Sequence, residues 1–205
     1  IDIPGRTIFA DNAYLPDDVR EQLEDAGEAS FNMGRVGMDL GFPDWVSTNE
    51  VHRIAAGFEG EIASGWTWDA YYQYGKTTNR FEGRNQVIMA NLNRALDAVR
   101  APDDSIVCRE TLTNPSSPCE PINFFGSNNY SAAAKQFVTG TAFNSLDYSQ
   151  HVVAGNVQGA LFDLPGGPLR VALGAEYRHD RASGESDAIS RAGGFNSGNP
   201  PGYNG

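Results

Sequence analysis

Four segments of this chain alternate apolar and polar side chains with a period of two residues, and this pattern constrains the fold most. Successive side chains of a β-strand point to opposite faces, so each segment is expected to be a strand with one apolar and one polar face. The apolar positions are Ile54, Ala56, Phe58 and Ile62; Trp66, Trp68, Ala70, Tyr72 and Tyr74; Val153, Val157 and Leu161; and Leu169, Val171, Leu173, Ala175 and Tyr177. The polar positions between them are Arg53, Glu59 and Glu61; Thr67, Asp69, Tyr71 and Gln73; Asn156 and Gln158; and Arg170, Glu176 and Arg178. We therefore predict a mainly β protein made of antiparallel hairpins, with short helices in its long loops.

The connections between these segments alternate in length. A tight turn, Ala63-Ser64-Gly65, joins the first two segments, and residues 164–168 join the last two. A connection of nearly seventy residues, about 81–148, lies between the two pairs. Short and long connections in alternation are typical of an outer-membrane β-barrel, which has short periplasmic turns and long external loops. Strands of this length can cross a bilayer when they are tilted.

A water-soluble β-protein is the alternative that fits the same alternation. There the aromatic side chains would fill a core and the charged face would be solvated. In a barrel the aromatic rings would form a girdle at the membrane boundary, and the charged residues would face the lumen. The soluble form that we consider is a secreted carbohydrate-binding module, with a stacking platform made of Trp66, Trp68, Tyr72 and Tyr74.

Three helices are expected outside the alternating segments. The first begins after Pro16, with Asp17 and Asp18 in its first turn, and ends at Gly27. Apolar residues at helical spacing predict a second helix over Asn85–Val99, and a third over 131–138 with Ser131 as its N-cap. Residues 30–40 could form an additional strand, interrupted by residues 41–44.

The balance of charge limits the partners of the chain. The net charge is −11 and the sequence pI is about 4.6, so nucleic acid is not expected as a partner, because it requires a basic surface. A polybasic membrane anchor is excluded for the same reason. The mean hydropathy is −0.42, and no stretch has the roughly 18 consecutive apolar residues of a membrane helix. A low mean hydropathy does not exclude membrane barrel strands, because apolar and polar residues alternate along them.

Two cysteines, Cys108 and Cys119, lie in a segment rich in Pro, Ser, Asn and Glu. They could be unrelated surface thiols. A local disulfide fits better, and it implies an oxidising compartment such as the periplasm or cell surface. Closing such a loop would stabilise the folded state by about 2–4 kcal/mol. A zinc site is not expected, because none of the histidines (His52, His151 and His179) is spaced near the cysteines as ligands usually are.

Signals of catalysis are weak. His179 lies beside Asp180 at the end of a predicted strand, with Ser183 and Ser186 nearby, but nothing sets a nucleophile, a base and an orienting group in geometry. A hydrolase that uses His179 is therefore ranked last. We find no phosphate-binding glycine loop and no calcium-loop spacing, so we expect no enzyme activity and no cofactor.

Several motifs, in order along the chain, resemble the barrel region of TonB-dependent receptors of Gram-negative bacteria. They are residues 57–61 (GFEGE), 65–75 (GWTWDAYYQYG), 95–99 (ALDAV), Cys108 to Cys119 with 121–126 (PINFFG), 161–168 (LFDLPGGP) and 174–178 (GAEYR). The resemblance implies a large outer-membrane barrel with an N-terminal plug domain, driven by the TonB complex of the inner membrane. It also implies uptake of a scarce nutrient: an iron–siderophore complex, cobalamin or a carbohydrate. No substrate-binding residues are transferred, because ligand contacts in this family sit in variable loops.

The resemblance divides the chain into five parts. Residues 1–50 would be an extracellular region with a short helix and a possible hairpin, and residues 51–80 would be barrel strands. Residues 81–148 would form a long extracellular loop with a helix and the disulfide, residues 149–181 a second pair of barrel strands, and residues 182–205 a truncated loop. The chain starts at Ile1 without Met or a signal peptide, and ends in a turn-forming tail, 196–205. We therefore expect a portion of a longer protein, without the plug.

Overall fold

The computed structural model describes residues 2–36, 38–63 and 65–196, and the chain divides into two compact units. The first unit comprises Ile1–Val46, Phe81–Asn144 and Ser186–Pro201, and the second comprises Ser47–Arg80, Ser145–Glu185 and Gly202–Gly205. The elements, in chain order, are β1 (Asp2–Phe9), α1 (Asp17–Ala26), β2 (Ser30–Val36), η1 (Met38–Leu40), β3 (Asp44–Ala63), β4 (Trp66–Val87), α2 (Met89–Leu96), β5 (Ala98–Arg100), β6 (Ile106–Cys108), η2 (Arg109–Leu112), α3 (Ala132–Val138), β7 (Thr139–Leu164), β8 (Gly167–Ser186) and α4 (Ala188–Arg191).

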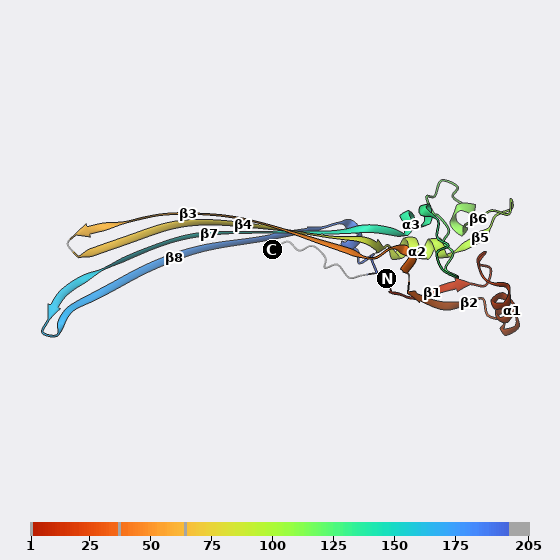
Figure 1. Ribbon diagram of the computed structural model, residues 1–205, viewed down its shortest axis with the longest axis horizontal. Coiled ribbons are helices and arrows are strands. Elements are labelled where there is room, and N and C mark those ends of the chain that lie inside the picture. The colour runs from red at the N-terminus through yellow and green to blue at the C-terminus, as the bar shows by residue number, and fades with distance from the viewer. Residues whose placement is uncertain (1, 37, 64, 197–205) are drawn as a thin grey trace. The chain divides into compact units, whose positions relative to one another are not determined.

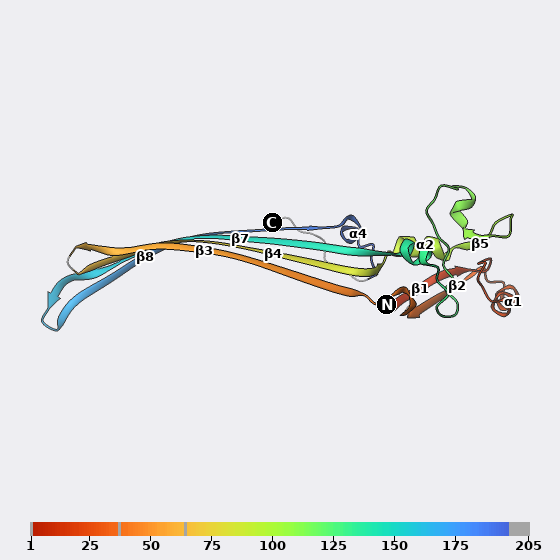
Figure 2. The same ribbon diagram turned by 45° about the horizontal axis from the view of Figure 1, so that its top comes forward.

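Strands β3, β4, β7 and β8 form one sheet in that order, and Figure 1 and Figure 2 show them as two long hairpins side by side. Their lengths are 20, 22, 26 and 20 residues. The protein is therefore mainly β with antiparallel sheets, as predicted. Within the described residues this sheet is open, with β3 and β8 at its edges.

Contacts between side chains establish the register of the sheet. Across β3 and β4, Asn79 donates to Asn49, and Gly60 faces the ring of Trp68. Across β4 and β7, Asn156 donates to Asp69 (2.8 Å), and Thr78 donates to Asp147 (2.6 Å). Residue numbers rise along one strand as they fall along its neighbour, so the ladder is antiparallel. Across β7 and β8, the matching contacts are Asn144 to Ser186 and Asn156 against Gly174.

All four strands are longer than the alternating segments that predicted them. Strand β4 continues to Val87 and β7 begins at Thr139, so both run into the stretch assigned to the long loop. The extensions were missed because they are polar on both faces, as at residues 77–80 (Thr-Thr-Asn-Arg). The turn between β7 and β8 lies where it was expected. Ser64 of the other predicted turn and residues 197–205 of the tail lie outside the described residues.

The first unit contains the hydrophobic core. Two small antiparallel sheets, β1 with β2 and β5 with β6, accompany its helices. The largest fully buried side chains include Phe124, Ile3, Ile8, Leu92 and Ile122. Beside Phe124, Arg35 donates to the Asp39 carboxylate (2.6 Å) and lies over the Tyr130 ring, 4.9 Å from its centroid. Burial raises the pKa of Tyr130 to about 12.

Two of the three helix predictions are confirmed. Gly27 ends α1 in the left-handed conformation, and the Ser131 side chain caps α3 by accepting from the Ala134 amide (3.0 Å). The prediction over Asn85–Val99 was too long, because α2 covers only Met89–Leu96. Val87 is the last residue of β4, and Val99 pairs with Val107 in a sheet, so both apolar residues belong to strands and not to the helix. None of the helices in the described residues is long and apolar enough to cross a membrane.

Candidate functional site

One face of the four-stranded sheet carries an unbroken apolar band. The register places five same-face positions of each strand in it: Ile54, Ala56, Phe58, Gly60 and Ile62 of β3; Trp66, Trp68, Ala70, Tyr72 and Tyr74 of β4; Val153, Gly155, Val157, Gly159 and Leu161 of β7; and Leu169, Val171, Leu173, Ala175 and Tyr177 of β8. No charged residue interrupts these described positions. Most of the large side chains are exposed, with Phe58 at 77% and Ile54 at 67%. This face is therefore apolar and uncovered.

Aromatic residues mark both ends of the band. Trp66 and Trp68 lie next to the turn between β3 and β4, and Trp66 packs against Gly159 of the neighbouring strand. A Cβ at Gly159 would collide with that ring, so glycine is required for the close approach. Tyr72, Tyr74 and Tyr177 lie toward the opposite end. Nine residues of extended strand span about 26 Å, close to the height of the apolar band of a membrane barrel.

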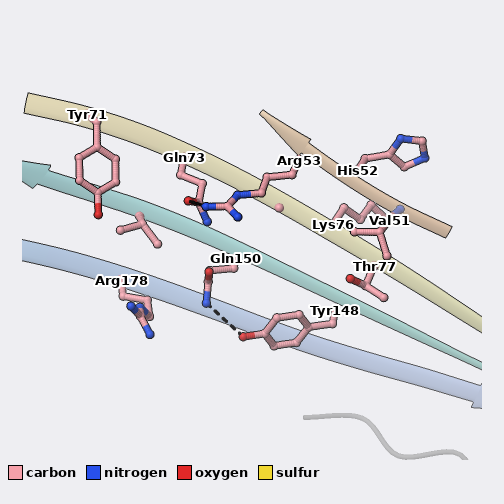
Figure 3. Close-up of a pocket in the computed structure, with 12 residues that line it drawn as sticks. Val51, His52, Arg53, Tyr71, Gln73, Lys76, Thr77, Tyr148, Gln150 and Arg178 are labelled. Atoms are coloured by element: carbon pink, nitrogen blue, oxygen red, sulfur yellow. Dashed lines mark hydrogen bonds between the residues drawn. The ribbon is translucent and has the colours of Figure 1, made fainter. Parts of the chain in front are cut away.

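The opposite face of the sheet carries most of its polar side chains, and several of them are paired across neighbouring strands. Arg53 donates to Gln73, and Tyr148 and Gln150 both donate to Asp180, at 2.8 and 2.9 Å. Figure 3 shows how Tyr71, together with Arg53, Gln73, Tyr148 and Gln150, lines an open hollow of about 460 Å³. The hollow presents amide, guanidinium and phenol groups, which can hydrogen-bond a polar solute or another polar surface.

The disulfide between Cys108 and Cys119 is present in the first unit, as predicted, with a Cα–Cα distance of 6.1 Å. Both cysteines are buried. Arg94 of α2 donates to both oxygens of Glu110, at 2.8 and 2.5 Å, and Ser117 donates to the same carboxylate. These hydrogen bonds, those from Arg94 first, lower the pKa of Glu110 to about 2.

Arg109, the residue after Cys108, forms a second ionic anchor. It donates to Asp11 (2.7 Å) and to Asp97 (3.0 Å), so it joins three separate stretches of the first unit. Its hydrogen bond to Asp11 is the main cause of the lowered pKa of that carboxyl. Neither anchor was predicted, because partners as distant in sequence as Asp11 and Arg109 leave no pattern in a single chain. The two anchors therefore connect the disulfide segment to α2 and to the segments that contain Asp11 and Asp97.

The residues considered for catalysis do not converge. His179 lies on the band face, with its ring 6.4 Å from that of His151. Asp180 lies on the opposite face, hydrogen-bonded to Tyr148 and Gln150. Neighbouring positions of a strand point apart, which is why adjacency in sequence did not become adjacency in space. Among the described residues, no group of three or more His, Cys, Asp or Glu side chains could hold a metal ion.

No protein-family model matches this chain, and no curated protein matches it either. The resemblance to TonB-dependent receptors therefore stays a prediction from the motifs.

Proposed function

We propose that this chain is a segment of the wall of an outer-membrane β-barrel transporter, of the TonB-dependent receptor kind, together with an external loop. In the intact protein the barrel would enclose its own plug domain and work with the TonB complex. The nutrient would be an iron–siderophore complex, cobalamin or a carbohydrate. The proposal describes a transporter segment of a Gram-negative outer membrane and not an enzyme.

The uncovered apolar band is the observation that carries the proposal. Side chains such as Phe58, Ile62 and Leu173 are more than 60% exposed, although each would gain free energy by leaving water. A lipid bilayer would cover all four strands at once. The band has the height that a bilayer requires and the aromatic borders that membrane barrels place at the interface.

The other features of the sheet support the same proposal. A short turn joins β7 to β8 at one end, whereas residues 88–138 connect β4 to β7 at the other. The strands also run on beyond the band, from Lys76 to Val87 in β4. In a barrel, this end would be the external one. The polar face would line the lumen, where water and a plug can satisfy its charged groups.

A cysteine scan along β8 tests the proposal in membranes from cells that make the protein. Each residue from 169 to 178 is replaced singly by Cys, and each variant is exposed to a photoactivatable probe dissolved in the acyl chains and to a membrane-impermeant maleimide. We expect the acyl-chain probe to label Leu169, Val171, Leu173, Ala175 and Tyr177 positions. The maleimide should label the even-numbered positions between them.

Labelling of neither series by the acyl-chain probe, with the protein recovered in a soluble fraction, would contradict the proposal. The competing function would then be a secreted carbohydrate-binding module. One observation favours that alternative: Trp66, Trp68, Tyr72 and Tyr74 do share one face, as a stacking platform requires. Glycan binding by the soluble protein, lost in Trp68→Ala, would support the module.

A further inference from the structure

The end of the apolar band that is remote from the turns carries a cluster of cationic and aromatic side chains. The register places Tyr74, His151 and His179 in one row across the sheet, and His52, Lys76 and Arg181 in the next row outward. We call these two rows the border rows. They contain every histidine of the chain. Ring contacts connect the first row: Tyr74 lies 4.8 Å from His151, and His151 lies 6.4 Å from His179.

The border rows are locally positive in a chain whose net charge is −11. The Arg181 guanidinium forms no hydrogen bond or ion pair with the part of the chain that the structure describes. Lys76 has one ionic partner, Asp147, at 3.7 Å, and both side chains are 46% exposed. Asp147 and Glu50 follow one row further out. Asp180, although next to Arg181, points to the opposite face. The two cations therefore stand between an apolar surface and an acidic one.

Lys76 and Arg181 can both donate to phosphate oxygens, and an imidazole N–H can add a further donor. Tyr72 hydrogen-bonds to the Nδ1 atom of His151 at 2.8 Å and so fixes that ring beside the cluster. Basic side chains immediately outside the apolar part of a membrane protein attract anionic headgroups. Tyrosine is favoured at the same depth, because its ring is apolar and its hydroxyl is polar.

We propose that the border rows bind the phosphate of an anionic lipid, with Lys76 and Arg181 as its principal contacts. This inference rests on the proposed function, because the acyl chains of that lipid would lie on the band, beside Val153 and Tyr177. The apolar surface is what favours a lipid over a free anion. A soluble phosphate compound would not contact the apolar band. A lipid would contact the band with its acyl chains and the two cations with its phosphate.

Arg181 and Arg178 provide a matched pair for the test, because they lie three residues apart on β8 and on opposite faces. The purified protein in detergent is titrated with phosphatidylglycerol or with phosphatidylcholine, and bound lipid is counted by native mass spectrometry. We expect phosphatidylglycerol to bind more tightly. Arg181→Gln and Lys76→Gln should each weaken it about fivefold, the effect of one basic residue near a membrane surface. Arg178→Gln should leave lipid binding unchanged.

Three results would overturn the inference: equal binding of the two lipids, an equal loss in Arg178→Gln, or displacement of phosphatidylglycerol by millimolar inorganic phosphate. The last would identify a site for free anions. The cysteine scan keeps the two proposals separate. If the acyl-chain probe labels the odd-numbered positions of β8 while Arg181→Gln binds phosphatidylglycerol normally, only the lipid site is lost. If the probe labels neither series, the membrane proposal itself is wrong.

Discussion

The two units of this chain use the same apolar residue types in opposite ways. Phe124 belongs to the first unit and is 1% exposed, within a cluster that also buries Leu92 and Ile122. Phe58 belongs to the second unit and is 77% exposed. Every member of the buried hydrophobic cluster comes from the first unit. The hydrophobic core therefore lies in the first unit, whereas most large apolar side chains of the band in the second unit are exposed.

The polar residues differ between the units as well. In the first unit they fasten distant segments, as Arg109 does with Asp11 and Asp97. In the second unit they pair across neighbouring strands, as Arg53 does with Gln73, and so line one face. The first unit obtains its cohesion from its own core, disulfide and ion pairs. The second is held by strand pairing, and its apolar face is exposed.

The largest expected effect comes from comparing two phenylalanines. Phe124→Ala should lower the free energy of unfolding of the first unit by about 4 kcal/mol, because it empties a fully buried site. Phe58→Ala should change the unfolding of that unit by less than about 0.5 kcal/mol. Hydrogen exchange at the amides around Leu92 measures both. An equal effect of the two substitutions would contradict the conclusion that the hydrophobic core lies in the first unit and not in the second.

The disulfide should give the next largest effect, confined to the first unit. Replacing both Cys108 and Cys119 by Ala should cost about 3 kcal/mol, because the unfolded chain regains the freedom of the closed loop. Amide exchange should then speed up around α2 and η2. Cross-strand protection in β7 and β8 should keep its wild-type rate, and serves as the internal control. Faster exchange in those strands would show that the disulfide supports the sheet as well.

The sheet was largely predictable because its cause is local. Alternation at Trp66–Tyr74 and Leu169–Tyr177 assigns strand and face, and these residues lie on the face that the pattern assigned them. The tight turns assign the two hairpins. The alternation could not tell what covers the apolar face, since a protein core and a lipid bilayer demand the same residues. The alternating pattern also ended before the strand did. Polar β-branched residues such as Thr77 and Thr78 continue β4, but both faces of the strand are polar there, so no alternation marks it.

The first unit was predictable only in its separate pieces. Helix α1, the Ser131 cap and the disulfide each depend on residues close in sequence, and each is present. The packing of those pieces depends on distant partners. Arg35 donates to the carbonyl of Phe124 (2.8 Å), and Asn12 donates to that of Leu96 (2.6 Å). Such pairs produce no periodic pattern in a single sequence, so they could not be predicted from it.

Two adjacent alanines sharpen the comparison for the second unit. Ala55 and Ala56 are both exposed, but Ala56 belongs to the band and Ala55 to the polar face. If the band lies in lipid, Ala56→Arg should destabilise the membrane-inserted protein by about 1 kcal/mol, because a charge would enter the border of the hydrocarbon region, level with Tyr72. Ala55→Arg should be nearly neutral. The measurement is urea unfolding in phospholipid vesicles. Equal effects would mean that lipid does not distinguish the two faces.

The smallest effect concerns Glu110, which tests whether the first unit is held by its ion pairs. The pKa of this carboxyl is lowered to about 2, first by the hydrogen bond from Arg94 and then by that from Ser117. A lowered pKa means that the ionised form stabilises the folded state. That contribution is complete above the ordinary value of 4.5 and disappears as the pH falls through about 2. Glu110→Gln should therefore lower the midpoint of thermal unfolding at pH 6, and the difference from wild type should close between pH 4.5 and pH 2.

Arg94→Gln is the companion variant, because it removes the main cause of the lowered pKa and leaves the carboxyl in place. Its difference from wild type should also shrink over the same pH range, since the hydrogen-bonded carboxylate is what both substitutions abolish. Other acids with lowered pKa values, such as Asp11, titrate equally in wild type and variant and so cancel in the difference. A difference that stays constant from pH 6 to pH 2 would show that Arg94 and Glu110 act through packing, and that the cohesion of the first unit owes nothing to this ion pair.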